Sequence, residues 1–205
     1  RQPTFPRLKS DDLPVVIAAG FVLVILAAGT AYTLTSLGTA PLLTPNYLLT
    51  QLQTGAFLGI AACGMMTVIL LGHIDLSIPW TMTAAAMMAT MVGGPAAIPT
   101  GLAVGLLVGL FNGFGVAYLR IPSMIFTLGV DSVMRGLMVA RTGGFAPQDT
   151  ATDLMRYLAA DKILGVPVAV FVWAGISMII AATLSRTALG KAIYATGNRD
   201  AAAYL

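Results

Sequence analysis

Six apolar segments of near membrane-spanning length constrain the fold of this chain more than any other feature. In hydrocarbon every backbone polar group must be satisfied internally, so an apolar segment of about 20 residues is expected to form a transmembrane helix. The composition agrees, because only 9% of the residues are charged, whereas soluble domains carry about 25%. We therefore predict an all-α polytopic transmembrane bundle of about six spans. The segments are residues 15–37, 52–71, 78–92, 97–119, 123–140 and 166–184.

Basic residues are divided unevenly between the two sets of connections, which predicts the orientation in the membrane. With six spans, both ends of the chain and the turn at Arg120 share one side, which carries seven basic residues. The other side carries three, mixed with three aspartates, in the loop 141–164. This asymmetry predicts a cytoplasmic N-terminus and an outward-facing loop with room for a short amphipathic helix. The net charge is only +3 and no basic patch interleaves with aromatic residues, which argues against nucleic acid as a partner.

A polar stretch, Gly-His-Ile-Asp-Leu-Ser at residues 72–77, interrupts the apolar pattern. A charge at membrane depth costs roughly 3 kcal/mol on insertion scales, so Asp75 needs a partner or a role. Gly72 and Pro79 flank the stretch and predict a broken helix, which is tolerated where it is buried or lines a cavity. Asp75 and Ser77 can cap the following helix. Half-helix ends at depth also line transport sites, so both roles remain open.

Glycines recur every four residues through the fourth segment, at Gly101, Gly105, Gly109 and Gly113. This spacing places them on one helix face, where another backbone can approach closely. We interpret the stripe as helix packing within the bundle, and a dimer seam is the alternative. Asn112 lies beside the stripe and is expected to make an interhelical hydrogen bond, with a contact to cargo as the alternative.

Two opposite charges lie within the fifth apolar segment. Asp131 and Arg135 are four residues apart, so on a helix they share a face. We predict that they form an intramembrane charge pair that neutralises both, and the alternative is a pair that gates a pathway. Cys63 and His73 are the single cysteine and histidine, so the sequence predicts no disulfide and no metal cluster. An intramembrane enzyme is the least expected class, because no nucleophile–base pair appears.

Three stretches, agreeing in order and spacing, resemble the permease subunits of ATP-driven monosaccharide importers of the ribose and xylose type. Residues 72–77 are similar to the Gly-Gly-Ile-Asp-Leu-Ser signature of that family. Residues 112–122, continuing through 127–129 and the Arg-Gly pair at 135–136, look like the segment that follows. Residues 189–198 resemble the cytoplasmic loop by which such permeases meet their ATPase. The resemblance covers the chain from about residue 46 to residue 205.

The sequence departs from the family at four positions. His73 stands where the family usually has glycine, and Pro79 and Trp80 replace a Gly-Ser type pair. Asp131 occupies a place that the family usually fills with an apolar residue. The sequence leaves open whether these residues tune specificity. The family continues beyond the cytoplasmic loop with further spans, so residues 1–205 are expected to be the first part of one larger transmembrane permease domain.

The resemblance implies a multi-pass subunit of the bacterial inner membrane that imports a monosaccharide or polyol. Its implied partners are cytosolic ATP-binding subunits, a periplasmic or lipid-anchored solute-binding protein, a second permease subunit and membrane lipid. The segment 187–205 would couple the ATPase to the bundle. Asp75, Ser77 and Asn112 are the candidates for the translocation path. The candidate coupling residues are Gly190, Lys191, Tyr194, Gly197, Asn198 and Arg199.

This chain is not expected to be an enzyme or to bind a cofactor or metal. Gly190-Lys191 lacks the glycine spacing and the following Ser or Thr of a phosphate loop. We therefore expect ATP to be bound by a partner subunit. Three other functions remain open. The first is a branched-chain amino-acid permease of the same ATP-driven class. The second is a stand-alone channel or proton-coupled carrier that uses Asp75, His73 and the Asp131–Arg135 pair, and the third is a membrane scaffold without transport.

Overall fold

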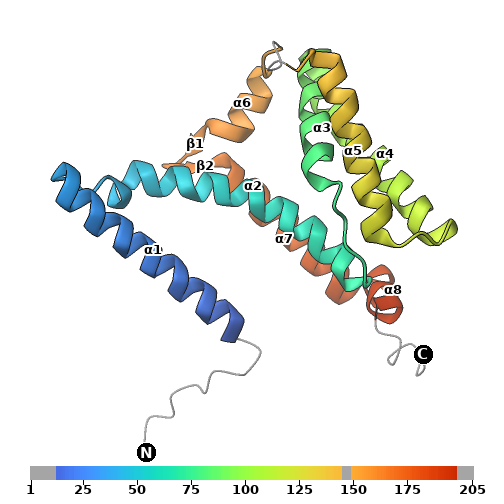
Figure 1. Cartoon of the computed structure of the whole chain (residues 1–205), viewed down its shortest axis with the longest axis horizontal. Coiled ribbons are helices and arrows are strands. Elements are labelled where there is room, and N and C mark those ends of the chain that lie inside the picture. The colour runs from blue at the N-terminus through green and yellow to red at the C-terminus, as the bar shows by residue number, and fades with distance from the viewer. Residues whose placement is uncertain (1–12, 145–148, 198–205) are drawn as a thin grey trace, which may run out of the picture. The chain divides into compact units, whose positions relative to one another are not determined.

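A computed structural model describes residues 13–144 and 149–197 of the chain, and most of these residues are helical (Figure 1). The predicted all-α class is therefore confirmed. Contacts divide the chain into two units, Arg1–Leu52 and Gln53–Leu205.

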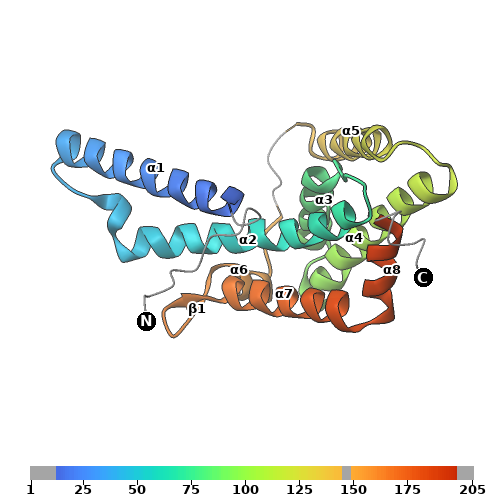
Figure 2. The same cartoon turned by 90° about the horizontal axis from the view of Figure 1, so that it is seen from below.

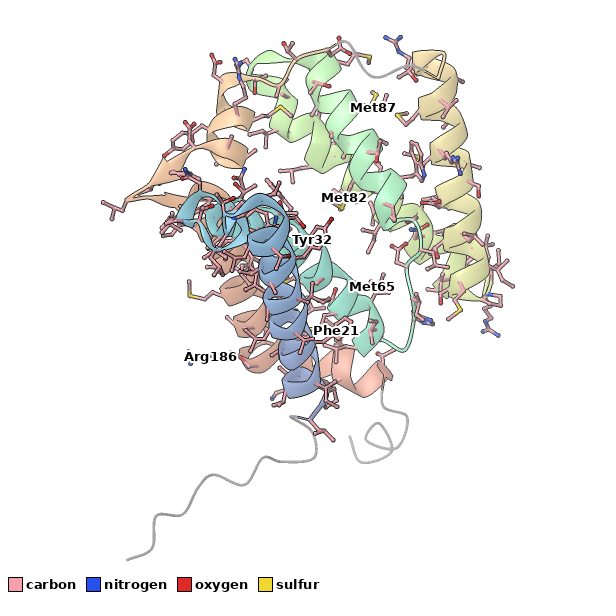
Figure 3. The ribbon with its side chains drawn as sticks, turned by 60° about the vertical axis from the view of Figure 1, so that its left-hand side comes forward. Phe21, Tyr32, Met65, Met82, Met87 and Arg186 are labelled. Carbon is pink, nitrogen blue, oxygen red and sulfur yellow. The ribbon has the colours of Figure 1, made fainter. Side chains whose placement is uncertain are left out.

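The first unit contains α1 (Leu13–Leu37), a 3₁₀ turn (Pro41–Leu43) and the start of α2 (Pro45–Leu70). Almost the whole surface of α1 is apolar and exposed, and Phe21 and Tyr32 project from it (Figure 3). A helix that is apolar all round belongs in lipid. The hydroxyl of Thr30 is satisfied within the helix, because it donates to the carbonyl of Leu26 at 2.7 Å.

In the second unit, α7 (Val168–Arg186) packs against α2. The indole of Trp173 occupies the space where Gly59 lacks a side chain, so a Cβ at Gly59 would overlap the ring. One helical turn further along α2, Cys63 Sγ lies 3.4 Å from Ser177 Oγ. The last helix, α8 (Ala188–Gly197), follows α7 directly and lies at the end of α2 (Figure 1).

Three further helices form a group of their own: α3 (Ile78–Val92), α4 (Ala97–Gly113) and α5 (Ser123–Thr142) (Figure 2). Small buried side chains, Ala84 and Ala97 among them, let the backbones of α3 and α4 approach closely. A turn through Gly93 and Gly94, both with positive φ, joins these two helices. α4 continues into a π-helical turn, Phe114–Tyr118, before the chain reverses into α5.

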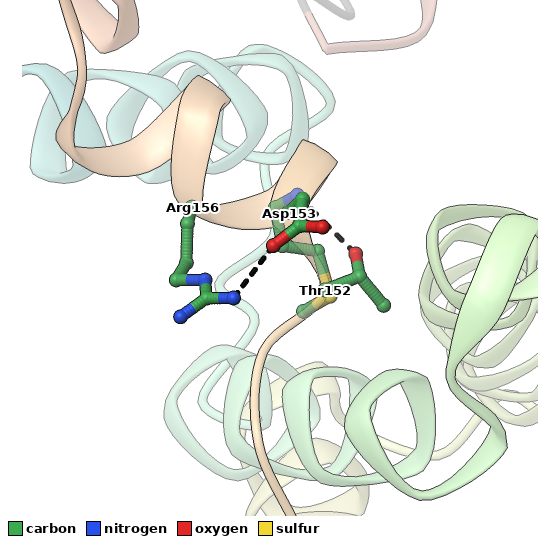
Figure 4. Close-up of polar contacts among 4 residues, drawn as sticks. Thr152, Asp153 and Arg156 are labelled. Carbon is green, nitrogen blue, oxygen red and sulfur yellow. Dashed lines mark hydrogen bonds and ion pairs between the residues drawn. The ribbon is translucent and has the colours of Figure 1, made fainter.

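The loop between α5 and α7 carries α6 (Asp153–Ala160), at the position predicted for a short helix. Thr152 caps α6, because its hydroxyl accepts from the N–H of Met155 at 3.3 Å, and Arg156 pairs with Asp153 at 2.6 Å (Figure 4). A two-stranded antiparallel hairpin follows, β1 (Lys162–Ile163) and β2 (Val166–Pro167). β2 leads directly into α7.

Among the residues that the structure describes, five helical stretches are long and apolar enough to cross a membrane: α1, α2, Gly94–Tyr118, α5 and α7. The remaining predicted span, α3, has 15 residues and covers only about 22 Å at 1.5 Å per residue. This is shorter than the hydrocarbon core of about 30 Å. A segment without regular structure, residues 73–77, precedes α3, so the third segment is a half-helix joined to non-helical chain.

Candidate functional site

The predicted helix break lies between α2 and α3. α2 ends at Leu70, and Gly72 has a φ of +81°, a conformation that favours glycine. The N–H groups of Gly72 and His73 still donate back to carbonyls in the last turn of α2, at 2.8 and 3.1 Å. Residues 73–77 have no regular secondary structure, so their backbone groups leave the helical ladder and need other partners.

Two hydroxyls of α5 supply part of those partners. Ser123 Oγ accepts from the N–H of Ile74 at 3.3 Å, and Thr127 Oγ1 accepts from the N–H of Leu76 at 2.9 Å. Residues two apart in this non-helical segment therefore meet residues four apart on one helix face. Ser123 and Thr127 were not among the predicted site residues, although their spacing of four at the start of an apolar helix was a usable signal.

The three predicted path residues form one hydrogen-bonded cluster. Asp75 Oδ1 accepts from the N–H of Ser77 at 2.8 Å and from its hydroxyl at 2.6 Å. Asn112, on α4, donates through Nδ2 to Ser77 Oγ at 2.7 Å and lies 3.3 Å from Asp75 Oδ2. Ser77 and Asn112 are buried, with 1% and 6% of their surface exposed. The Ser77 side chain makes no cap to α3, because it serves Asp75 instead.

The cluster satisfies a carboxylate with neutral donors. Because an ionised carboxylate only accepts hydrogen bonds, the nitrogen of the Asn112 amide must face Asp75. Its oxygen, Oδ1, therefore points elsewhere, and it is buried without a hydrogen-bond partner among the described residues. A buried unpaired acceptor costs about 1–3 kcal/mol. The orientation of Asn112 that presents its N–H₂ to Asp75 and Ser77 therefore leaves its Oδ1 unpaired, which lowers the stability of the fold.

A cavity of about 390 Å³ adjoins this cluster. Val68, Leu71 and Val116 contribute apolar walls. None of the described residues that line it is a lysine or arginine, and His73 is the one basic side chain among them. The polar residues of its lining are His73, Asp75, Asn112, Ser123, Thr127 and Thr196.

The predicted charge pair is not formed. Asp131 and Arg135 make no ion pair among the described residues. Arg135 is exposed, and its guanidinium lies 5.8 Å from the centre of the Trp80 ring on α3. Asp131 Oδ1 is buried and has no hydrogen-bond partner among the residues that the structure describes. The prediction was wrong because a spacing of four permits contact within a helix but does not exclude a competing partner on another helix.

The predicted packing role of the glycine stripe holds at one position. A Cβ at Gly101 would lie 3.4 Å from the carbonyl oxygen of Ala85 on α3. The corresponding positions at Gly105, Gly109 and Gly113 have nothing within 4 Å in the described residues. Packing at these three stays a prediction, because a small residue allows a close approach without specifying a neighbour.

The candidate coupling residues that the structure describes lie on α8. Lys191 and Tyr194 are exposed. Gly190 and Gly197 make the closest approaches to other helices, since a Cβ at either would overlap a carbonyl oxygen. Asn198 and Arg199 lie outside the described residues.

A sequence model of the family described as "Branched-chain amino acid transport system / permease component" matches residues 47–205. The chain belongs to this permease family. The matched range contains the three stretches that resembled importer permeases, so the permease prediction is confirmed.

Two relatives illustrate the similarity. The autoinducer 2 import system permease protein LsrC of Salmonella paratyphi B is 31% identical over 166 residues, which cover 76% of this chain and 48% of the relative. LsrC of Escherichia coli O9:H4 is 30% identical over 156 residues, covering 73% of this chain and 45% of the relative. The chain spans about half the length of the curated relatives it matches. No solved structure matches it.

Proposed function

We propose that this chain is part of the transmembrane subunit of an ATP-driven importer for a monosaccharide or similar polyol in the bacterial inner membrane. The observation that carries the proposal is the cavity beside Asp75, Ser77 and Asn112. Its volume lies within the range of about 300–1,000 Å³ that is usual for small-molecule sites. Two findings support import as the direction of transport. The chain belongs to the permease family, and the relatives are named as import-system permeases.

The charges around the cavity favour a sugar over a branched-chain amino acid, the alternative cargo. An amino acid carries an ammonium group, which could pair with Asp75, and a carboxylate, which finds no lysine or arginine in the described lining. A hydroxyl group can donate to Asp75 and can also accept from a neighbouring hydroxyl. A neutral polyhydroxylated molecule therefore fits the lining, and the autoinducer 2 of the relatives' name is one candidate to test.

Partners must supply the energy and the delivery. In this proposal cytosolic ATP-binding subunits bind ATP, an external solute-binding protein delivers the cargo, and a second permease subunit completes the pathway. Lys191 and Tyr194 are exposed on α8 and so are accessible to a cytosolic ATP-binding subunit. The N-terminus lies in the cytoplasm, as the distribution of basic residues indicates.

The test begins with co-purification. The complete reading frame is expressed in its own membranes, the permease is purified in mild detergent, and its partners are identified by mass spectrometry. We expect an ATPase and a solute-binding protein, and the ligand carried by that binding protein names the cargo. A purified permease with neither partner would contradict the proposal.

Uptake into proteoliposomes then separates the alternatives. With the ATPase and the binding protein present, uptake of the labelled polyol should require hydrolysable ATP and should stop with a non-hydrolysable analogue. Uptake that persists without ATP and follows the pH gradient would support the stand-alone carrier instead. Uptake of leucine or valine, with no uptake of polyols, would support the amino-acid permease.

A further inference from the structure

The two ends of α8 are held against two different helices. At its first turn, Gly190 lies against the carbonyls of Thr183 and Leu184 on α7, and its N–H donates to Thr187 Oγ1 at 3.2 Å. At its last turn, Gly197 abuts the carbonyl oxygen of Leu70 so closely that a Cβ would overlap it. α8 therefore bridges the C-terminal ends of α7 and α2.

The contact with α2 lies close to the helix break. Leu70 is the last residue of α2, and Gly72 with its positive φ follows two positions later. From Gly72 the chain reaches Asp75 through backbone without regular structure rather than through a helix. A displacement of the end of α2 would therefore be transmitted to this non-helical segment, whose backbone is bonded to α5 through side chains and not through a continuous ladder.

The neighbour of Gly197 forms part of the cavity itself. Thr196 lines the same cavity as Asp75 and Asn112, although about 120 residues of sequence separate it from Asp75. The hydroxyl of Thr196 donates to the carbonyl of Ala192 within α8 at 2.8 Å, so it is fixed to its own helix. When α8 moves, this part of the wall must move with it.

We infer that α8 is a movable wall of the Asp75 cavity, that Gly197 positions it against Leu70, and that displacement of α8 opens the cavity. Only one part of the inference rests on the proposed function, namely that a cytosolic ATP-binding subunit displaces α8. The helix proposed to meet the ATPase is then also the gate of the cargo cavity. Gly197 acts as a positioning residue, because its missing side chain sets the distance between α8 and α2.

Thiol accessibility tests the gate without cargo or ATP. Ile74→Cys places a thiol at a cavity-lining position in a Cys63→Ser background, within the complete reading frame. The labelling rate with a charged maleimide is measured in detergent with and without Gly197→Ala. We expect labelling to rise about tenfold with Gly197→Ala, because a minor open state becomes a major one. Gly175→Ala is the matched control, since nothing lies within 4 Å of that helical glycine.

The inference would be overturned if folded Gly197→Ala and Gly175→Ala proteins were labelled at the same rate. If Gly197→Ala does not fold, Thr196→Trp provides the second test, because a larger side chain on α8 should fill the cavity and slow the labelling. Unchanged labelling with Thr196→Trp would also overturn it. A permease that shows the gated labelling but transports no polyol would contradict the proposed function while supporting the gate.

Discussion

Replacing Asn112 by aspartate should strongly destabilise the permease, because the change sets a second carboxylate against Asp75. The amide nitrogen that would become an oxygen lies 3.3 and 3.4 Å from the two oxygens of Asp75, and Asn112 is only 6% exposed. Two unit charges at this distance repel each other by about 5 kcal/mol at an effective dielectric constant of about 20. Structural relaxation or a shared proton would relieve part of this repulsion. The remainder should still exceed the ~1 kcal/mol that an ordinary hydrogen bond contributes.

The assay is the free energy of unfolding of the complete permease in mixed micelles, measured by titration with a denaturing detergent. Asn46→Asp is the matched control, because it makes the same chemical change at an exposed residue in the first turn of α2, where a negative charge is favourable. Asn112→Ala should be milder than Asn112→Asp, since it removes the donor but also the unpaired Oδ1. Equal stability of Asn112→Asp and Asn46→Asp would refute the conclusion that the amide nitrogen faces an ionised Asp75.

Three further substitutions test other contacts, each by the same unfolding measurement. Ser77→Ala should lower the free energy of unfolding by about 1–2 kcal/mol, within the range for interhelical and charge-assisted hydrogen bonds. Its control, Ser132→Ala, removes an exposed hydroxyl bonded within its own helix and should cost less than about 0.5 kcal/mol. Equal losses for the two variants would contradict the cluster. Gly115→Ala should cost about 1–3 kcal/mol through overpacking, because its Cβ would overlap the ring of Phe126, while Gly105→Ala has open space and should be neutral. Trp80→Leu should lose about 0.5–1 kcal/mol more unfolding free energy than Trp80→Phe, because phenylalanine keeps an aromatic face for the guanidinium of Arg135. Identical losses for the two variants would argue against a cation–π contribution.

The helices could be predicted from the sequence because their limits depend on local chemistry. Gly72 favours a positive φ and Pro79 suits the first turn of a helix, so the break between α2 and α3 was expected at the residues where it occurs. Asp75 and Ser77 were also predictable as a site, since polar groups at membrane depth need partners. The identification of Asn112 as the third member relied on its being an isolated amide in an apolar segment.

Contacts between helices could not be predicted in the same way. The spacing of Asp131 and Arg135 defines a shared face, but only the placement of α3 against α5 brings Trp80 to the guanidinium. The glycines of α4 permit a close approach along the whole helix, yet α3 makes one at Gly101 only. In both cases the sequence describes what a surface can accept, and the three-dimensional arrangement decides which neighbour is present.

The way in which Asp75 is satisfied bears on the kind of cargo it could handle. A carboxylate paired with arginine would lose a strong partner each time cargo bound. Asp75 is held instead by hydroxyl, amide and backbone donors. A sugar hydroxyl that replaced one of these donors would exchange one hydrogen bond for another, so the net gain would be small and binding would be weak and reversible. Passage through a membrane requires this balance, because a site that binds too tightly does not release its cargo.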